Sequence, residues 1–288
     1  MKRLAVLLLA AGLALAALKA AAASASVEGV QMPAWVERGG KRTPLEPGMS
    51  LDAGDELRTG IGARLYLKLP DASLIRLGEN ASLRLLELEA EREGLFRAAL
   101  RVLEGAFRFT TEVLTRNRRR EVRITLRNVT AGVRGTDLWG RSTEAKQVVC
   151  LIEGLIEVQP EGEAGLTMDQ PLQFYVREGG TSQPVSFVNP AQLAQWAAET
   201  DIAPGQGAAR RGGAWKVVVA SPDTQLLALS VYDRLRADGY AAHIRPERSG
   251  EGFVYQVRLA SLPTRADAEA LAARLGTTYG PAAPAVGR

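Results

Sequence analysis

Between residues 27 and about 176 the chain is a series of short segments in which apolar and polar residues alternate. The clearest is Arg64-Leu65-Tyr66-Leu67-Lys68-Leu69, and Gly, Pro and Asn separate it from its neighbours. Further segments of this kind lie at 73–77, 82–85, 101–103, 107–109, 122–126, 148–152 and 155–158. A period of two places side chains on opposite faces of a strand, so this spacing predicts an all-β sandwich or roll. The charged residues 87–97 fit either a hairpin tip or a helical turn.

Two more β-like pieces, at 173–176 and 185–188, lead into a helix. Asn189 suits the N-cap and Pro190 the first helical position. Leu193, Trp196 and Ala197 share one face, so we expect this helix to pack on the β domain. Residues 203–213 are mainly Gly, Ala, Pro and Arg, which predicts a flexible linker. We therefore assign residues 177–200 to a β/helix extension and 201–213 to the linker.

Residues 214–288 mix the helical and the strand period, which predicts a small α/β module. Its expected elements are a strand at 215–220, a helix from Ser221-Pro222 to Gly239, a strand at 240–245, a turn at 246–252, a strand at 253–260, a helix from Thr264 to Gly276 and a short edge strand within 277–286. The last strand is short because it contains two prolines. The order β-α-β-β-α-β predicts a ferredoxin-like α+β domain.

In this layout both helices cover one face of the sheet and the other face stays open. Alternation assigns Val217, Val219, Ala242, Ile244, Val257 and Leu259 to the helix side. It assigns Lys216, Val218, His243, Arg245, Gln256 and Arg258 to the open side. The open set carries three positive charges and no acid, which favours an anionic polymer rich in hydroxyl and amide groups. The alternative is an ordinary solvated sheet surface, and His243 is expected to be a surface residue because it lacks a partner motif.

The first residues have the form of an export signal. Met1-Lys2-Arg3 is positive, residues 4–18 are apolar apart from Gly12, and Ala23-Ser24-Ala25 offers a small-x-small cleavage site. The apolar run is shorter than the ~20 residues that a membrane-spanning helix needs. We therefore expect a signal peptide at 1–25 and a periplasmic location, with an uncleaved N-terminal anchor as the alternative. A lipoprotein anchor is excluded because no Cys follows the run.

The charge balance changes once this signal is set aside. The chain has 36 Lys+Arg and 32 Asp+Glu, a net charge of +4. The first 25 residues hold three of those bases and no acid, so the remainder has 33 bases and 32 acids, a charge of +1. This balance argues against a nucleic-acid binder, as do the export signal and the absence of adjacent exposed aromatics on the open sheet.

Few catalytic arrangements are compatible with the composition. One Cys and one His exclude an internal disulfide and a Cys/His zinc site. A nucleophile and base of that kind would require Cys150 and His243 to meet. A pair of catalytic carboxylates stays open because Asp and Glu are plentiful.

Three local motifs in the β region have both a structural and a functional reading. An apolar-Glu-Gly-x-apolar pattern occurs at 103–107 and 152–156, and we expect Gly105 and Gly154 to lie at positive φ between short strands. Arg134-Gly135-Thr136 favours turn architecture over contact with a ligand. A cluster of arginines favours a solvated hairpin tip over a patch for an anionic polymer; its members are Arg116, Arg118, Arg119, Arg120, Arg123 and Arg127.

Several pieces of the β region form a recognisable set. They are Leu45-Glu46-Pro47-Gly48, residues 53–60, the strand at 64–69 with Pro70-Asp71-Ala72-Ser73, Val133-Arg134-Gly135-Thr136, and Glu153-Gly154 with Val158. This set resembles the FecR-like domain, over residues 27–176. The resemblance implies an extracytoplasmic, non-catalytic module that acts as a scaffold or binds an unidentified partner. FecR regulators also contact a sigma factor through a cytoplasmic segment, which we do not expect here because three residues before the apolar run cannot form a helix.

The C-terminal module carries a second set, namely Ala220-Ser221, Ala237-Asp238-Gly239-Tyr240, Tyr255-Gln256-Val257-Arg258-Leu259 and residues 264–275. This set resembles the SPOR (sporulation-related repeat) domain over residues 214–288. The resemblance implies binding to peptidoglycan glycan strands that lack stem peptides, often at division sites. It adds Ser221 to the open-face residues as a glycan-binding candidate. The chain departs from the family at Val218, Pro222 and Gln256, where Gln, an aromatic residue and Arg are common.

Together these features predict a non-enzymatic periplasmic envelope protein that binds peptidoglycan through its C-terminal module. We expect no catalytic residue, cofactor, metal or nucleic-acid partner, and no stable membrane span after signal removal. The alternative is a peptidoglycan hydrolase, or a hydrolase-associated protein, that its SPOR-like domain targets to the wall.

Overall fold

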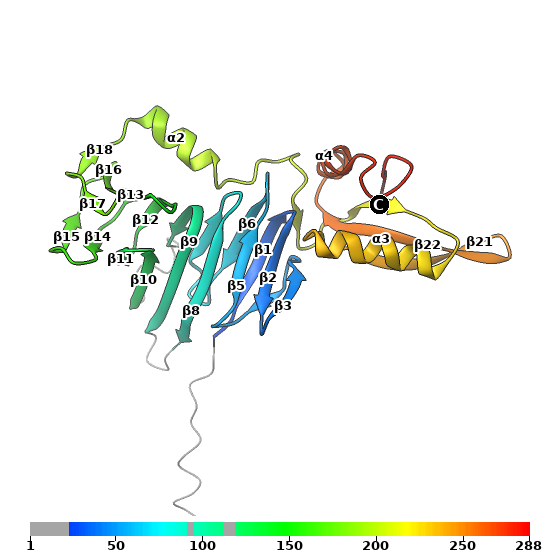
Figure 1. Ribbon diagram of the computed structural model, residues 1–288, viewed down its shortest axis with the longest axis horizontal. Coiled ribbons are helices and arrows are strands. Elements are labelled where there is room, and N and C mark those ends of the chain that lie inside the picture. The colour runs from blue at the N-terminus through cyan, green and yellow to red at the C-terminus, as the bar shows by residue number, and fades with distance from the viewer. Residues whose placement is uncertain (1–22, 91–94, 112–118) are drawn as a thin grey trace, which may run out of the picture.

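The computed structural model describes residues 23–90, 95–111 and 119–288 (Figure 1). A large β-module lies beside a smaller C-terminal module of strands and helices. The β-rich, multi-domain organisation predicted from the sequence is confirmed. Residues 1–22 of the predicted signal peptide lie outside the described residues. Within the described ranges, no helix has the length and apolar character that a membrane crossing requires.

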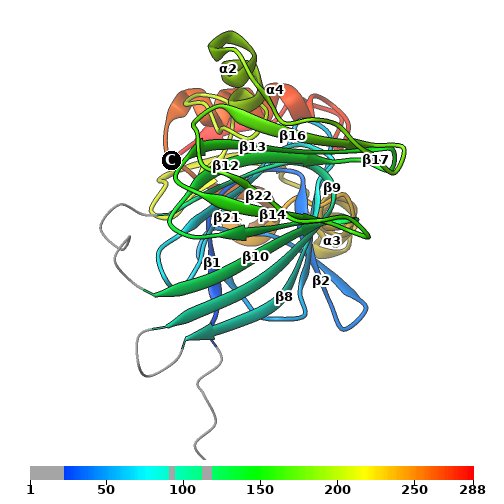
Figure 2. The ribbon, with the colours of Figure 1, turned by 90° about the vertical axis from the view of Figure 1, so that its left-hand side faces the viewer.

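The β-module consists of two sheets that share one strand, β9. The first sheet has the order β3-β2-β5-β8-β9-β10-β11-β14-β15. The second has the order β1-β6-β7-β9-β12-β13-β16, with β4 and β19 on β1 and with β17 and β18 on β16. Figure 2 shows β12, β13 and β16 of the second sheet above β8 and β10 of the first.

The strands of the β-module are short except for β8 and β9. Their bounds are β1 (Ala25–Gln31), β2 (Ala34–Arg38), β3 (Lys41–Pro44), β4 (Ser50–Leu51), β5 (Glu56–Thr59), β6 (Arg64–Lys68), β7 (Leu74–Leu77), β8 (Ser82–Ala90), β9 (Phe96–Thr110), β10 (Arg120–Leu126), β11 (Val129–Val133), β12 (Asp137–Ser142), β13 (Lys146–Glu153), β14 (Ile156–Pro160), β15 (Leu166–Met168), β16 (Gln173–Glu178), β17 (Thr181–Ser182), β18 (Ser186–Phe187) and β19 (Ala209–Arg210). β1 begins at Ala25, so the folded module includes the last residue of the predicted signal.

The long strand β9 passes from the first sheet to the second. Residues 96–104 pair with β8, whereas residues 105–110 pair with β12. The change falls at Gly105, which has a φ of 87° and where a Cβ would lie 2.6 Å from the Ala81 Cα. The positive φ is confirmed, but the prediction of two short strands around Gly105 is wrong because one continuous strand serves both sheets.

A second crossing between the sheets lies where the β11–β12 and β13–β14 connections meet. Gly135 and Gly154 have φ values of 68° and 98°. A Cβ on Gly154 would lie 2.6 Å from the Gly135 carbonyl oxygen. The Thr136 hydroxyl donates to the Leu155 carbonyl at 2.9 Å. The turn predicted at residues 134–136 is therefore confirmed, and it holds two corners of the module together.

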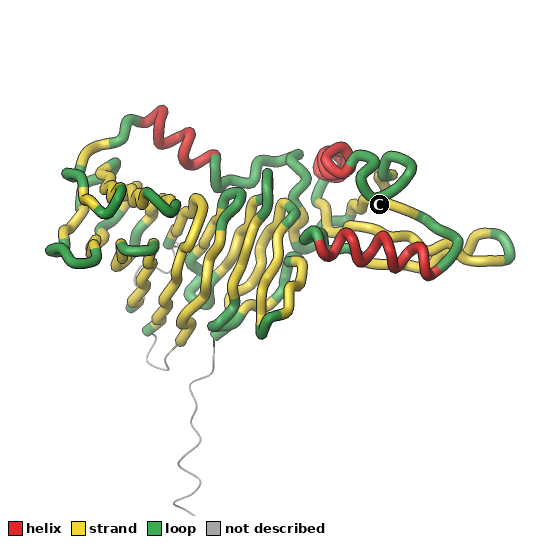
Figure 3. Tube along the Cα trace, viewed as in Figure 1, coloured by secondary structure: helices red, strands yellow, loops and turns green. Residues whose placement is uncertain are grey.

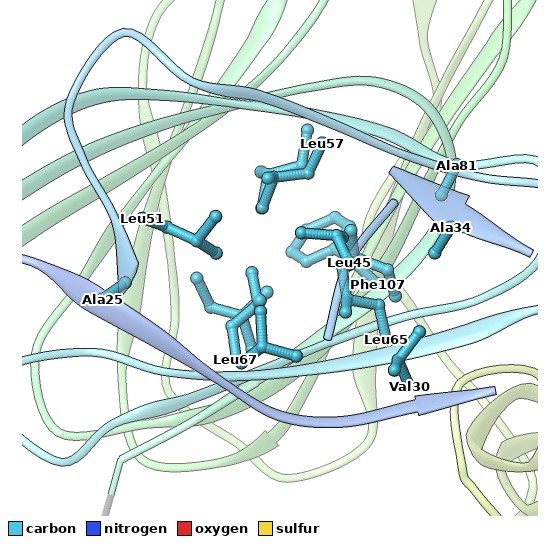
Figure 4. Close-up of a cluster of buried hydrophobic side chains, with 14 of the residues drawn as sticks. Ala25, Val30, Ala34, Leu45, Leu51, Leu57, Leu65, Leu67, Ala81 and Phe107 are labelled. Atoms are coloured by element: carbon cyan, nitrogen blue, oxygen red, sulfur yellow. The ribbon is translucent and has the colours of Figure 1, made fainter. Parts of the chain in front are cut away.

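Apolar side chains from both sheets meet in one core (Figure 4). Leu57 comes from the first sheet and Leu65 and Leu67 from the second, and all three are fully buried. Phe107 enters the same core from the shared strand β9. Burial of each such side chain stabilises the fold by about 1.5–3 kcal/mol, so the alternating pattern of the sequence positions both sheets.

The helix α2 (Pro190–Ala198) packs on the β-module as the sequence predicts. Its N-cap Asn189 accepts the Gln192 amide at 2.8 Å, and Pro190 occupies the first turn. The Trp196 ring stacks on Trp139 of β12, with centroids 4.6 Å apart. Figure 3 shows α2 as the helical segment of the β-module, set on its edge.

The segment predicted as a flexible linker is held at several points, so the prediction of flexibility is wrong. Ala209 and Arg210 form β19, which pairs with Val30 and Gly29 of β1. The Gly207 amide donates to the buried Asp267 carboxylate of the C-terminal module at 3.1 Å. Composition alone does not reveal these contacts, because backbone groups of small residues make them.

The C-terminal module has the element order β20 (Trp215–Ala220), α3 (Gln225–Ala237), β21 (His243–Ser249), β22 (Gly252–Leu262), α4 (Arg265–Leu275) and β23 (Ala285–Gly287). Its sheet has the strand order β21-β22-β20-β23, with antiparallel neighbours. Val217, Val219, Val257 and Leu259 are buried, in agreement with their assignment to the helix side.

Several boundaries in this module differ from the sequence prediction, and β21 starts at His243 instead of residue 240. Helix α3 starts at Gln225 with Thr224 as its N-cap, so Ser221 and Pro222 precede the helix. Strand β21 continues through Pro246 to Ser249, and the turn occupies only two residues, Gly250 and Glu251. Pro246 is tolerated because β21 is an edge strand of the sheet.

The two modules pack directly against each other. The Ala34 amide donates to the Gly239 carbonyl at 3.0 Å, across the boundary between β2 and the end of α3. A Cβ on Gly239 would lie 2.8 Å from Trp35 Cε3. Glu46 reaches His243 at the start of β21, at 3.2 Å. The β-module therefore borders one end of the C-terminal sheet.

Candidate functional site

Six of the seven candidate residues lie on the strands of the C-terminal sheet. His243 of β21, Arg258 of β22 and Val218 of β20 form one row across three strands. Arg245 and Gln256 are directly paired in the next position along the hairpin. Lys216 lies two residues before Val218 on the same strand. These six side chains are exposed or partly exposed, while their neighbours in sequence Val217, Val257 and Leu259 are buried.

Arg258 occupies the centre of this surface, which we call the open face. Neither Arg258 nor Arg245 makes a side-chain hydrogen bond or ion pair with any described residue, and the Arg258 Nε atom is screened from solvent. The Lys216 ammonium donates to the main-chain oxygen of Arg288. The open face therefore holds two guanidinium groups that no acid of the described chain neutralises.

The open face is bordered by acids that the sequence analysis did not place there. Because β21 continues past Arg245, Glu247 follows it on the same side and accepts the Gln256 amide at 2.7 Å. Glu46 of the β-module contacts His243 at the other end of β21. The expected absence of acids is wrong for this reason. The alternation of His243, Arg245 and Glu247 indicates that Glu247 shares the open face. The assignment of Pro246 to a turn ended the predicted strand before Glu247.

The surroundings of Glu46 favour the charged form of its carboxyl group. The hydrogen bond with His243 lowers the pKa of the Glu46 carboxyl, and the charge of Arg236 adds to this effect against the opposing effect of burial. Arg236 approaches from α3 at 3.9 Å. Glu46 therefore ties the β-module to both a strand and a helix of the C-terminal module.

Ser221 is separate from the row formed by His243, Arg258 and Val218. It follows the end of β20 and lines a mostly apolar pocket of about 420 Å³. Leu227 and Val231 of α3 and Tyr279 form other walls of this pocket. The structure thus brings six candidate residues together on the open face and places Ser221 beside a different cavity.

Three members of the arginine cluster of the β-module lie near acids, and Arg119 is exposed. Arg123 lies 3.6 Å from Glu87, and Arg127 lies 3.6 Å from Glu104. Arg120 is buried 3.5 Å from Asp71. Strands β8 and β9 pair in antiparallel fashion up to Ala90 and Phe96, so residues 87–90 and 96–97 of the charged segment 87–97 belong to strands and not to a helical turn, while residues 91–94 lie outside the described residues. Arg116 and Arg118 lie outside the described residues.

Cys150 and His243 belong to different modules and do not form a pair. Cys150 is buried beside Trp139 and Val176, and desolvation raises the pKa of its thiol to about 12. His243 lies on the open face. Among residues 23–90, 95–111 and 119–288, no cluster of His, Cys, Asp and Glu side chains is arranged to hold a metal ion.

Comparison with protein families identifies both modules. Residues 55–157 match the family model described as FecR protein, and residues 211–284 match the SPOR domain model. Both resemblances found in the sequence are thereby confirmed. Comparison with curated proteins gives no match.

Two crystal structures of a proposed anti-sigma factor from Parabacteroides distasonis are similar to this chain at 13% identity and a TM-score of 0.40. The first match, at 1.65 Å resolution, covers 69% of this chain and 97% of the other. The second, at 2.50 Å resolution, covers 77% of this chain and 90% of the other.

Proposed function

We propose that this chain, which combines a FecR domain with a C-terminal SPOR domain, is a non-enzymatic periplasmic envelope protein that binds peptidoglycan glycan strands without stem peptides. The SPOR match supports peptidoglycan as the ligand. The FecR domain serves as a scaffold or binds a further partner, and the division site is the location that a preference for stripped glycan favours.

The observation that carries this proposal is the pair of unneutralised guanidinium groups on the open face. Removal of a stem peptide frees a lactyl carboxylate on each muramic acid. A guanidinium group binds a carboxylate through two parallel hydrogen bonds, and such charge-assisted bonds are stronger than neutral ones. Arg258 and Arg245 are therefore suited to distinguish stripped glycan from glycan whose carboxylates are still linked to peptides.

The remaining open-face residues match the neutral parts of a glycan. Gln256, His243 and the Lys216 ammonium offer hydrogen bonds to hydroxyl and acetamide groups. Val218 lies directly opposite Arg258 on the neighbouring strand and provides a flat apolar contact. No step of bond cleavage is assigned to these side chains, because neither a carboxylate pair nor a nucleophile with its base is formed by the open-face candidates.

The proposal is tested by pull-down with purified sacculi, before and after an amidase removes the stem peptides. We expect the chain from residue 24 onward to bind stripped sacculi more tightly and to release no muropeptide. Soluble muropeptides would instead support the hydrolase alternative. The variant Arg258→Glu with Lys216→Glu should lose most of the binding.

A matched control has the same change of charge away from the open face. Arg248 lies on β21 but points to the other side, and Arg265 is exposed on α4 beside Glu269. Arg248→Glu with Arg265→Glu should bind stripped sacculi as the unaltered chain does. Equal loss in both double variants would mean that net charge, and not the open face, governs binding.

A further inference from the structure

Two acids mark the ends of the cationic part of the open face. At the end next to the β-module, Glu46 lies 3.2 Å from His243 and 3.9 Å from Arg236. Toward the hairpin turn, Glu247 accepts the Gln256 amide at 2.7 Å. Arg245 lies between His243 and Glu247 on β21. An anionic ligand that follows this strand therefore meets a carboxylate on each side of the guanidinium groups.

The spacing of these acids limits how densely a ligand can be charged. His243 and Glu247 are four residues apart, which is about 13 Å along a strand. A nucleic-acid strand carries a phosphate every ~3.4 Å, so several phosphates fall within this distance and some of them meet the acids. A stripped glycan strand carries one carboxylate for every two sugars. It can place a single carboxylate on the guanidinium groups and leave neutral sugars beside the acids.

We propose that Glu46 and Glu247 are specificity-determining residues that exclude densely charged polyanions from the open face. This inference rests on the proposed function, because it concerns the same surface. The guanidinium groups attract any anion, and the two carboxylates restrict that attraction to ligands with widely spaced charges. Specificity by repulsion of the wrong ligand is a general feature of selective binding surfaces.

Glu46 makes this selectivity a property of both modules. It belongs to the β-module, and its carboxylate offsets the charge of Arg236 and engages His243. Without it, the charge of Arg236 at the edge of the open face would have no partner among the acids that the structure places there. The β-module thus contributes one of the residues that set the ligand of the SPOR domain.

The test compares two anionic probes at one ionic strength. Glu46→Gln, Glu247→Gln and the double variant are made in the full chain from residue 24 onward. The probes are a duplex DNA of 20 base pairs and amidase-stripped sacculi. Glu46 and Glu247 lie next to the place where DNA phosphates would bind, so salt screens their repulsion less than that of distant charges. We therefore expect the double variant to bind DNA at least about 10-fold more tightly. Binding to stripped sacculi should change by less than about 3-fold.

Glu269→Gln is the matched control, because Glu269 is exposed on α4 and pairs only with Arg265 among the described residues. It removes one negative charge, as Glu46→Gln and Glu247→Gln each do, and should leave DNA binding unchanged. The exclusion role is refuted if the affinity of the double variant rises equally for DNA and for sacculi, or if its affinity for DNA rises no more than that of Glu269→Gln. In either case the proposed function stands. If no variant binds sacculi, the proposed function fails as well. Glu247→Gln keeps the test valid if Glu46→Gln disturbs the contact between the modules.

Discussion

Replacing Gly239 with alanine should loosen the contact between the two modules. Gly239 follows α3 with a φ of 87°, and an added Cβ would lie 2.8 Å from Trp35 Cε3 and 3.2 Å from Pro33 Cβ. Carbon atoms in contact are ~3.5–4.0 Å apart, so the modules would have to shift. Overpacking of this kind costs about 1–3 kcal/mol. At 1.4 kcal/mol per tenfold change, the docking equilibrium should weaken about 5- to 150-fold.

The control for the backbone effect is Gly250→Ala. Gly250 lies at the β21–β22 turn of the same module with a φ of 61°, but an added Cβ there has no neighbour within 4 Å. Both variants bear the cost of a side chain at positive φ, about 1–2 kcal/mol, and only Gly239→Ala disturbs the interface.

Trypsin reports the difference, because Arg210 and Arg211 lie in the segment between the modules. Arg210 belongs to β19, which is paired with β1. Cleavage there should be faster in Gly239→Ala than in Gly250→Ala, and small-angle scattering should show a larger radius of gyration. Equal cleavage rates and equal radii in the two variants would refute the inference that this contact holds the modules together.

Three further predictions concern stability and reactivity. The pKa of Glu46 is lowered in the folded chain, so its contribution to stability is complete above the ordinary Glu pKa of ~4.3 and is lost as the pH falls through the lowered value. Thermal unfolding measured between pH 6 and 3 should show this loss of stability, and the loss should be smaller in Glu46→Gln. Cys150, with a pKa of about 12, should resist a thiol reagent at pH 8 until urea unfolds the chain, and rapid native labelling would contradict its burial. In urea titrations, Gly154→Ala should destabilise the β-module by about 2–5 kcal/mol and Gly135→Ala by about 1–2 kcal/mol. The difference arises because an added Cβ meets the Gly135 carbonyl oxygen only in Gly154→Ala. Equal losses of stability in the two variants would contradict the corner geometry.

Local patterns in the sequence predicted much of the architecture. The alternation of Val217, Val219, Val257 and Leu259 gave the buried side of the C-terminal sheet, because a period of two fixes which face a strand buries. Asn189 and Pro190 marked the start of α2, because N-cap chemistry is local. The positive φ of Gly105 and Gly154 also followed from residue type.

Features that depend on distant contacts could not be predicted in this way. The linker composition of residues 203–213 gives no sign of its pairing with β1, since main-chain groups make that contact. Glu46 lies nearly 200 positions before His243, and only the packing of the two modules brings them together. Glu247 was missed for a local reason, because Pro246 is tolerated on an edge strand and does not end it.

A titration followed by nuclear magnetic resonance can locate the ligand on the molecule. Stripped glycan oligosaccharides would be added to the ¹⁵N-labelled chain from residue 24 onward, while the backbone amide signals and the Arg Nε–H signals are recorded. We expect saturable shifts at Arg258 Nε–H and in β20, β21 and β22, with the β-module unaffected away from Glu46. Shifts confined to the β-module, or none at ligand concentrations that saturate binding to sacculi, would show that the guanidinium groups of the C-terminal sheet do not hold the wall polymer.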